Sequence, residues 1–139
     1  MAVPAIADSQ ARIEACDRNI TYLLSRQPIQ FAPGTADMDH TAFSALDAIT
    51  EEAAQCATAS IIIEGHTDSR GYEARNVQLS LARANAVADY LVARGIDRDR
   101  IVAEGLGSAQ PIADNASRDG RRANRRVVIR LTHQPTNQS

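Results

Sequence analysis

The densest group of polar residues that could do chemistry is the run from Gly65 to Gly71, which reads Gly-His-Thr-Asp-Ser-Arg-Gly. It follows the apolar run Ile61-Ile62-Ile63, which predicts a strand buried on both faces and stopped by Gly65. Open α/β sheets commonly place binding sites where strands end. Asp68 is therefore either a binding carboxylate or a turn and capping residue, because aspartate is common in turns.

Two enzyme classes are disfavoured by this run. His66 and Asp68 have no third ligand at helical spacing, which a zinc site would need. Ser69 lies outside the Gly-x-Ser-x-Gly pattern of a nucleophile elbow, which a hydrolase of that kind would need. We therefore expect a binding module rather than an enzyme, with no metal and no cofactor.

Arg83 is the second candidate for chemistry. A helix is predicted from Asn76 to Arg94 by the spacing of Leu79, Ala84, Val87 and Leu91, with Asn76 or Ser80 as its cap and Gly95 following its end. Arg83 is either a solvated residue whose stem covers apolar surface, or a cation standing over the loop of Asp68. In the second case the two side chains offer a carboxylate to an ammonium and a guanidinium to a carboxylate, which suits a zwitterionic amino-acid head group.

The elements that must position these residues alternate along the chain. Two amphipathic helices are predicted at Ser9–Arg26 and from Asp39, as N-cap, to Gln55. Besides the isoleucine run, the sequence predicts short strands at Ile29–Phe31, Ile101–Val102 and Val127–Leu131, a loop at Pro33–Thr35, a polar connection at Pro111–Gly120 and a frayed tail at His133–Ser139. This order predicts an α/β sandwich with helices on one face of a small sheet.

Composition excludes several classes of protein. The chain has 139 residues, which suits one domain, and its formal net charge of −2 does not suggest a polybasic nucleic-acid binder. An arginine run (Arg118, Arg121, Arg122, Arg125, Arg126 and Arg130) carries no interleaved aromatic residues for base stacking, so we expect no nucleic-acid partner and a mostly solvated surface. No apolar run approaches the roughly 20 residues that cross a bilayer.

The two cysteines, Cys16 and Cys56, are too far apart for a CxxC redox motif. They are either reduced core residues of a cytosolic protein or one structural disulfide of an exported domain. Their spacing alone does not decide between these readings.

Several short motifs occur in one order between Pro28 and Leu131. They are Gly65-His66-Thr67-Asp68, Asn76, Leu79-Ser80 with Arg83-Ala84, Gly105-Leu106-Gly107, Pro111-Ile112-Ala113, Asn115, Gly120-Arg121 and Asn124-Arg125-Arg126-Val127. Together they resemble the OmpA-like peptidoglycan-binding domain, a family that includes the peptidoglycan-associated lipoprotein and the stator protein MotB. The resemblance implies a βαβαβ-type fold with a mixed sheet at residues 28–132, an extra N-terminal helix at residues 1–27 and a flexible tail at 133–139.

The resemblance also implies a ligand and a site. The family binds the meso-diaminopimelate of the peptidoglycan stem peptide, whose free end carries an ammonium and a carboxylate. By position, Asp68 would accept the ammonium and Arg83 would pair with the carboxylate, while Asn76 would support the loop. The remaining ligand-binding residues would be Thr67, Arg125, Gly34 and Thr35.

This sequence departs from the family pattern at two places near the site. The loop Ala32-Pro33-Gly34-Thr35 lacks an Asp-x-Asn sequence, so its contacts are expected from backbone groups. Arg70 stands where a small polar residue is common, and the extra cation could strengthen or distort carboxylate capture.

The resemblance implies an exported protein of the periplasm and cell envelope, associated with the outer membrane or cell wall. In that oxidising compartment a Cys16–Cys56 disulfide is expected, as in some relatives. Membrane attachment would come from parts of a parent protein outside this chain. The alternative is a protein-binding adaptor or a stator-type homodimer that uses helix 76–94 as an interface, which an exposed apolar patch on that helix would favour.

Overall fold

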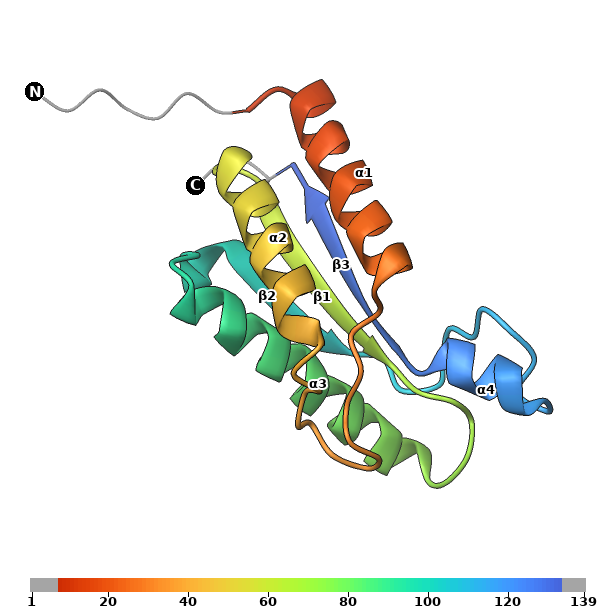
Figure 1. The fold of residues 1–139 in the computed structure, drawn as a ribbon. Coiled ribbons are helices and arrows are strands. Elements are labelled where there is room, and N and C mark those ends of the chain that lie inside the picture. Colours follow the sequence, from red (N-terminus) through yellow and green to blue (C-terminus); the bar gives the residue numbers. More distant parts are fainter. Residues whose placement is uncertain (1–7, 134–139) are drawn as a thin grey trace, which may run out of the picture.

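The computed structural model describes residues 8–133, which fold into helices on one side of a three-stranded sheet (Figure 1). The elements are α1 (Gln10–Arg26), α2 (Ala42–Gln55), β1 (Ser60–His66), α3 (Glu73–Ala93), a 3₁₀ turn at Arg98–Arg100, β2 (Ile101–Gly105), α4 (Arg118–Asn124) and β3 (Arg126–Thr132). The expected α/β sandwich with a mixed sheet is therefore confirmed. Of the predicted tail at 133–139, residues 134–139 lie outside the described residues.

The sheet has the order β2-β1-β3, so β1 is the central strand. It runs parallel to β2, with Ile61 opposite Ile101, and antiparallel to β3, with Ile61 opposite Leu131. The helices α1, α2 and α3 cover one face (Figure 1), and Ile61 and Ile63 are buried beneath them. Ile62 points to the other face and is only half-buried, so the prediction of a strand buried on both faces is wrong.

Helix α1 has the bounds that its apolar spacing predicts. The Ser9 side chain accepts a hydrogen bond from the Arg12 backbone N–H, and Ile13 and Ile20 are buried against the sheet. Asp17 faces the free edge of β3, where its carboxylate accepts a 2.8 Å hydrogen bond from the Leu131 N–H. Pairing of that edge with another strand is thereby blocked at this position.

Two glycines let α3 lie very close to the sheet. Gly65 and Gly105 are opposite each other in the β1–β2 register. A Cβ on Gly65 would collide with the Ser80 carbonyl, and one on Gly105 would collide with the backbone around Leu81. Strand β1 continues through Gly65 to His66, so the prediction that Gly65 stops the strand is wrong: this glycine serves helix packing instead.

Helix α3 begins three residues before its predicted start at Asn76. Its first turn is polar and exposed, so apolar periodicity gives no signal there. Glu73 in that turn accepts hydrogen bonds from the backbone and hydroxyl of Ser108, which lower the pKa of its carboxyl. The predicted role of Gly95 is confirmed, because it follows the C-cap with φ of +103°.

Three other predictions of secondary structure need correction. The predicted strand at Ile29–Phe31 is reduced to a single bridge between Phe31 and Met38. The polar connection after Pro111 ends in α4, a helix whose mainly polar residues give no apolar period. Helix α2 begins at Ala42 rather than directly after Asp39, although the Asp39 carboxylate still accepts a hydrogen bond from the Thr41 N–H.

The expected disulfide between Cys16 and Cys56 is present. It joins the middle of α1 to the residue that follows α2, and both cysteines are buried in the apolar core. The C-terminal end of α2 is also held by Arg100, whose guanidinium donates hydrogen bonds to the carbonyls of Ala53, Cys56 and Ala59. None of the helices within residues 8–133 has the length and apolar character of a membrane span.

Replacing both cysteines, Cys16→Ala with Cys56→Ala, should lower the free energy of unfolding by about 2–4 kcal/mol, because the bridge closes a long loop of the unfolded chain. Urea denaturation followed by circular dichroism measures the change. The wild-type protein under reducing conditions is the control and should show a similar loss. A double variant within about 0.5 kcal/mol of the oxidised wild type would contradict this role.

Candidate functional site

A cavity of about 1440 Å³ opens beside the C-terminal end of β1, bounded by the segment 28–34, the β1–α3 loop, α4 and β3. Most of the residues predicted for the site line it: Gly34, Thr67, Asp68, Asn76, Arg83 and Arg125. Thr35 does not line the cavity, but its carbonyl contacts Arg83. The fold thus brings together residues that are as far as 91 positions apart in the chain, from Gly34 to Arg125.

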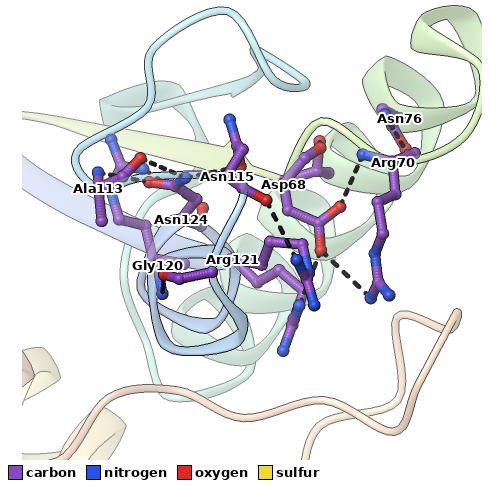
Figure 2. A network of polar contacts seen from close by, with 12 residues as sticks. Asp68, Arg70, Asn76, Ala113, Asn115, Gly120, Arg121 and Asn124 are labelled. Atoms are coloured by element: carbon purple, nitrogen blue, oxygen red, sulfur yellow. Dashed lines mark hydrogen bonds and ion pairs between the residues drawn. The ribbon is translucent and has the colours of Figure 1, made fainter.

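Asp68 is buried in the β1–α3 loop, where Arg70 lies beside it (Figure 2) and Arg125 forms a second ion pair with it. Its Oδ1 accepts a 2.9 Å hydrogen bond from the Arg70 backbone N–H, while its Oδ2 lies 2.7 Å from Arg125 Nη1 and 3.6 Å from Arg70 Nη2. Burial by itself raises the pKa of Asp68, but these hydrogen bonds and charges outweigh it and lower the pKa. Asp68 is therefore both a turn residue and a charged carboxylate beside the cavity.

Arg83 is a buried cation, with only 8% of its surface exposed. Its Nε donates a 2.8 Å hydrogen bond to the Thr35 carbonyl, and its guanidinium carbon lies 5.0 Å from the centre of the Phe31 ring. Burial and the nearby Arg125 charge lower its pKa. Within residues 8–133, no carboxylate lies at ion-pair distance from Arg83, so this charge is desolvated without a counter-ion.

Two of the predicted residues hold the loop that carries Asp68. Asn76 donates a 3.0 Å hydrogen bond from its side-chain amide to the Arg70 carbonyl (Figure 2). The Thr67 hydroxyl donates to the Asp68 carbonyl, and the Thr67 N–H donates to the Gly107 carbonyl at 2.8 Å. These bonds fix the direction in which the Asp68 side chain leaves the sheet.

Asn124 is a positioning residue whose role the sequence reading missed. It is fully buried, and its Oδ1 accepts hydrogen bonds from the Ile112 and Ala113 N–H groups. Its amide donates to the Ala113 carbonyl and to Asn115 Oδ1, which completes its hydrogen bonding (Figure 2). Asn124 thus anchors the end of α4 immediately before Arg125. It occurs among the family motifs, but no pattern in its own segment indicates the segment 112–115 as its partner.

His66 is not among the residues that line the cavity. It is buried, its Nε2 lies 3.4 Å from Glu64 Oε1, and burial followed by the Arg126 charge lowers its pKa. The residues that the structure describes contain no cluster of three or more His, Cys, Asp or Glu that could hold a metal ion.

The expectation that the arginine run is mostly solvated surface is confirmed: four of its six members are exposed, and Arg121 and Arg126 are half-buried. Three of its members, Arg122, Arg125 and Arg126, line the cavity. Arg126 also donates a hydrogen bond to the Gln110 carbonyl, and Arg121 donates to the Asn115 carbonyl. Half of the run therefore faces the charged cavity.

Comparison with known proteins identifies similar chains. The sequence profile of the OmpA family matches residues 30–125. The peptidoglycan-binding protein ArfA of Mycobacterium tuberculosis is 44% identical over 102 residues, which cover 73% of this chain and 31% of ArfA. Outer membrane protein A of Bordetella avium is 46% identical over 86 residues, covering 62% of this chain and 44% of that protein. The chain thus spans less than half the length of either relative.

A solved structure has the same fold. The crystal structure of a MotB-like protein from Desulfovibrio vulgaris superposes with a TM-score of 0.72 at 23% identity, and the match covers 93% of this chain and 98% of that one. At this identity the likeness concerns the fold alone.

Asn124→Ala should lower the free energy of unfolding by about 2–3 kcal/mol, because the Ile112 and Ala113 N–H groups lose their acceptor in a buried place. The matched control is Asn115→Ala, which removes one acceptor and should cost less than about 1 kcal/mol. Urea denaturation measures both variants. Equal losses in the two would show that Asn124 has no special anchoring role.

Arg83→Met should leave the free energy of unfolding within about 1 kcal/mol of wild type, or raise it, because methionine fills much of the same volume without burying an unpaired charge. Thermal and urea unfolding measure the effect. A loss above about 2 kcal/mol would mean that Arg83 is a structural residue rather than an open binding group.

Proposed function

The chain belongs to the OmpA family, and from this premise we propose that it binds peptidoglycan without a covalent link and tethers a cell-envelope protein to the wall. Support comes from the name of ArfA, a peptidoglycan-binding protein, and from Outer membrane protein A, a protein of the envelope. The proposed location is the periplasm, where the disulfide would be stable. The proposed domain is residues 28–132, preceded by α1 as an extension.

The observation that carries the proposal is Arg83, a buried cation at the cavity wall for which the described part of the chain supplies no counter-ion. A desolvated guanidinium is costly, and an anion that arrives with good geometry removes much of that cost. A ligand carboxylate can form two parallel hydrogen bonds with the guanidinium. The Nε bond to Thr35 and the Phe31 ring keep the group oriented before the ligand arrives.

The proposed ligand is the meso-diaminopimelate of the stem peptide. Its free end carries an ammonium and a carboxylate on one carbon, so it needs an anion and a cation side by side. Asp68 is charged and lies on the same cavity as Arg83, so it would take the ammonium. Gly34 and Thr35 would add backbone contacts, Asn76 and Thr67 would hold the loop, and Arg125 would contact the ligand beside Asp68.

The same residues support binding without catalysis. The charged side chains that line the cavity are arginines and two aspartates, set among apolar residues such as Phe31 and Leu79, which suits charge recognition. Two charged hydrogen bonds and a few neutral ones are compatible with a micromolar dissociation constant, which corresponds to about 8 kcal/mol. Several copies along the polymer would then strengthen attachment by avidity.

The alternative function is an adaptor or stator-type dimer that uses α3. One observation favours it: Val77 and Leu81 lie one turn apart on α3, and each is 38% exposed. Sedimentation analysis of the purified chain tests it, with Leu81→Ser as the variant. A dimer that Leu81→Ser dissociates, in a protein that does not bind stem peptide, would favour the adaptor.

The peptidoglycan proposal is tested by calorimetric titration with a meso-diaminopimelate stem peptide and with its lysine counterpart, which lacks the terminal carboxylate. We expect saturable binding that prefers diaminopimelate. Asp68→Ala and Arg83→Met should each weaken it about tenfold or more, because each removes a charge-assisted hydrogen bond.

The matched controls for this titration are Asp89→Ala and Arg98→Ala, which remove an exposed ion pair outside the cavity and should bind as wild type does. Circular dichroism confirms that each variant is folded. The proposal fails if the folded wild type binds neither peptide, or if the Asp68 and Arg83 variants bind as well as the controls.

A further inference from the structure

The cavity carries more positive charge than a zwitterion can balance. Its lining includes six arginines and only two carboxylates: Arg70, Arg75, Arg83, Arg122, Arg125, Arg126, Asp68 and Asp119. Four positive charges are therefore in excess over the whole wall. A diaminopimelate end with one ammonium and one carboxylate is neutral, so binding it leaves this excess in place.

The excess of positive charge is most concentrated around Asp68. Its Oδ2 is shared by Arg125 Nη1 at 2.7 Å and Arg70 Nη2 at 3.6 Å. One carboxylate thus serves two guanidiniums before any ligand is bound. A ligand ammonium that binds Asp68 competes with both and adds a third positive charge beside them, which is repulsive unless another anion arrives with it.

We propose that Arg70 and Arg125 bind a second carboxylate of the same ligand, so that the cavity selects stem peptides with a free carboxylate next to diaminopimelate. This inference rests on the proposed function. In the stem, the residue before diaminopimelate is a γ-linked glutamyl residue whose α-carboxyl is either free or amidated. Amidation removes one negative charge with almost no change in size, so it separates charge recognition from shape.

Arg70 is placed to determine specificity without holding the fold. Its side chain is 67% exposed, so the guanidinium is open to a ligand. The loop is fastened by its backbone instead: the Arg70 N–H donates to Asp68, and the Arg70 carbonyl accepts from Asn76. Removing the side chain therefore leaves both loop contacts intact. Arg125 contributes the nearer guanidinium from the residue that follows α4.

The test is a calorimetric titration with two synthetic peptides, N-acetyl-γ-glutamyl-diaminopimelyl-alanine with the glutamyl α-carboxyl free or amidated. The wild type should bind the free acid about 5- to 10-fold more tightly at low salt, the strength expected of a partly exposed charged contact. The preference should shrink as salt rises. Arg70→Gln should reduce it to about twofold or less while leaving the amidated peptide bound, and Arg125→Gln should reduce it similarly while weakening the binding of both peptides.

The matched control is Arg118→Gln, which removes the same charge from α4 at a position outside the cavity and should keep the wild-type preference. Equal binding of the two peptides by the wild type would overturn the inference and leave peptidoglycan binding standing. A preference that survives in both Arg70→Gln and Arg125→Gln would also overturn it. Failure to bind either peptide would overturn the proposed function itself.

Discussion

The close approach of α3 to the sheet is the constraint on which the site depends. Gly65 and Gly105 are paired across β1 and β2 and have no side chains, so the backbone of α3 contacts the sheet there at Ser80 and Leu81. The Ser80 hydroxyl accepts a hydrogen bond from the Gly107 N–H, which fixes the helix relative to the end of β2. Arg83 lies about one turn farther along α3, and Asp68 lies three residues beyond Gly65. The close approach of the α3 backbone to these two glycines therefore sets the spacing between the two charged groups.

The site keeps a charge that the fold alone does not need. Arg83 contributes a hydrogen bond and an aromatic contact, but its guanidinium remains buried without an anion among the described residues. Asp68 differs from Arg83, because its carboxylate already forms ion pairs with Arg70 and Arg125. Before a ligand binds, Asp68 is therefore already paired with cations, whereas Arg83 has no anionic partner among the described residues. Such uneven pairing is typical of sites that give up some stability to be organised in advance.

Local patterns predicted the elements that carry a clear apolar period. Helix α1 and the end of α3 at Gly95 follow directly from the sequence. The mainly polar α4 has no such period, although Ser117 before it accepts a hydrogen bond from the Gly120 N–H and is a capping signal that could have been used. The role of Gly65 cannot be predicted locally, because a strand glycine needed for helix contact looks the same in sequence as one that ends a strand.

For the candidate site, the sequence and the family resemblance indicated Asp68 and Arg83, but not how they are partnered. The ion pair between Asp68 and Arg125 joins residues 57 positions apart. The anchoring of residues 112–115 by Asn124 depends on how α4 packs, which no local pattern specifies. Long-range polar contacts of this kind become predictable only once the strand order is known.

The direction of the strands has a mechanical consequence. Asp8, the first residue that the structure describes, bonds to Thr58 next to the start of β1, and β3 ends opposite Ser60 at the same end of the sheet. The cavity lies at the other end. A pull between a wall held at Asp68 and either end of the described chain would therefore run along the strands. The hydrogen bonds of the sheet would then share the load in shear instead of opening one after another, and the Cys16–Cys56 bridge would bear part of it covalently.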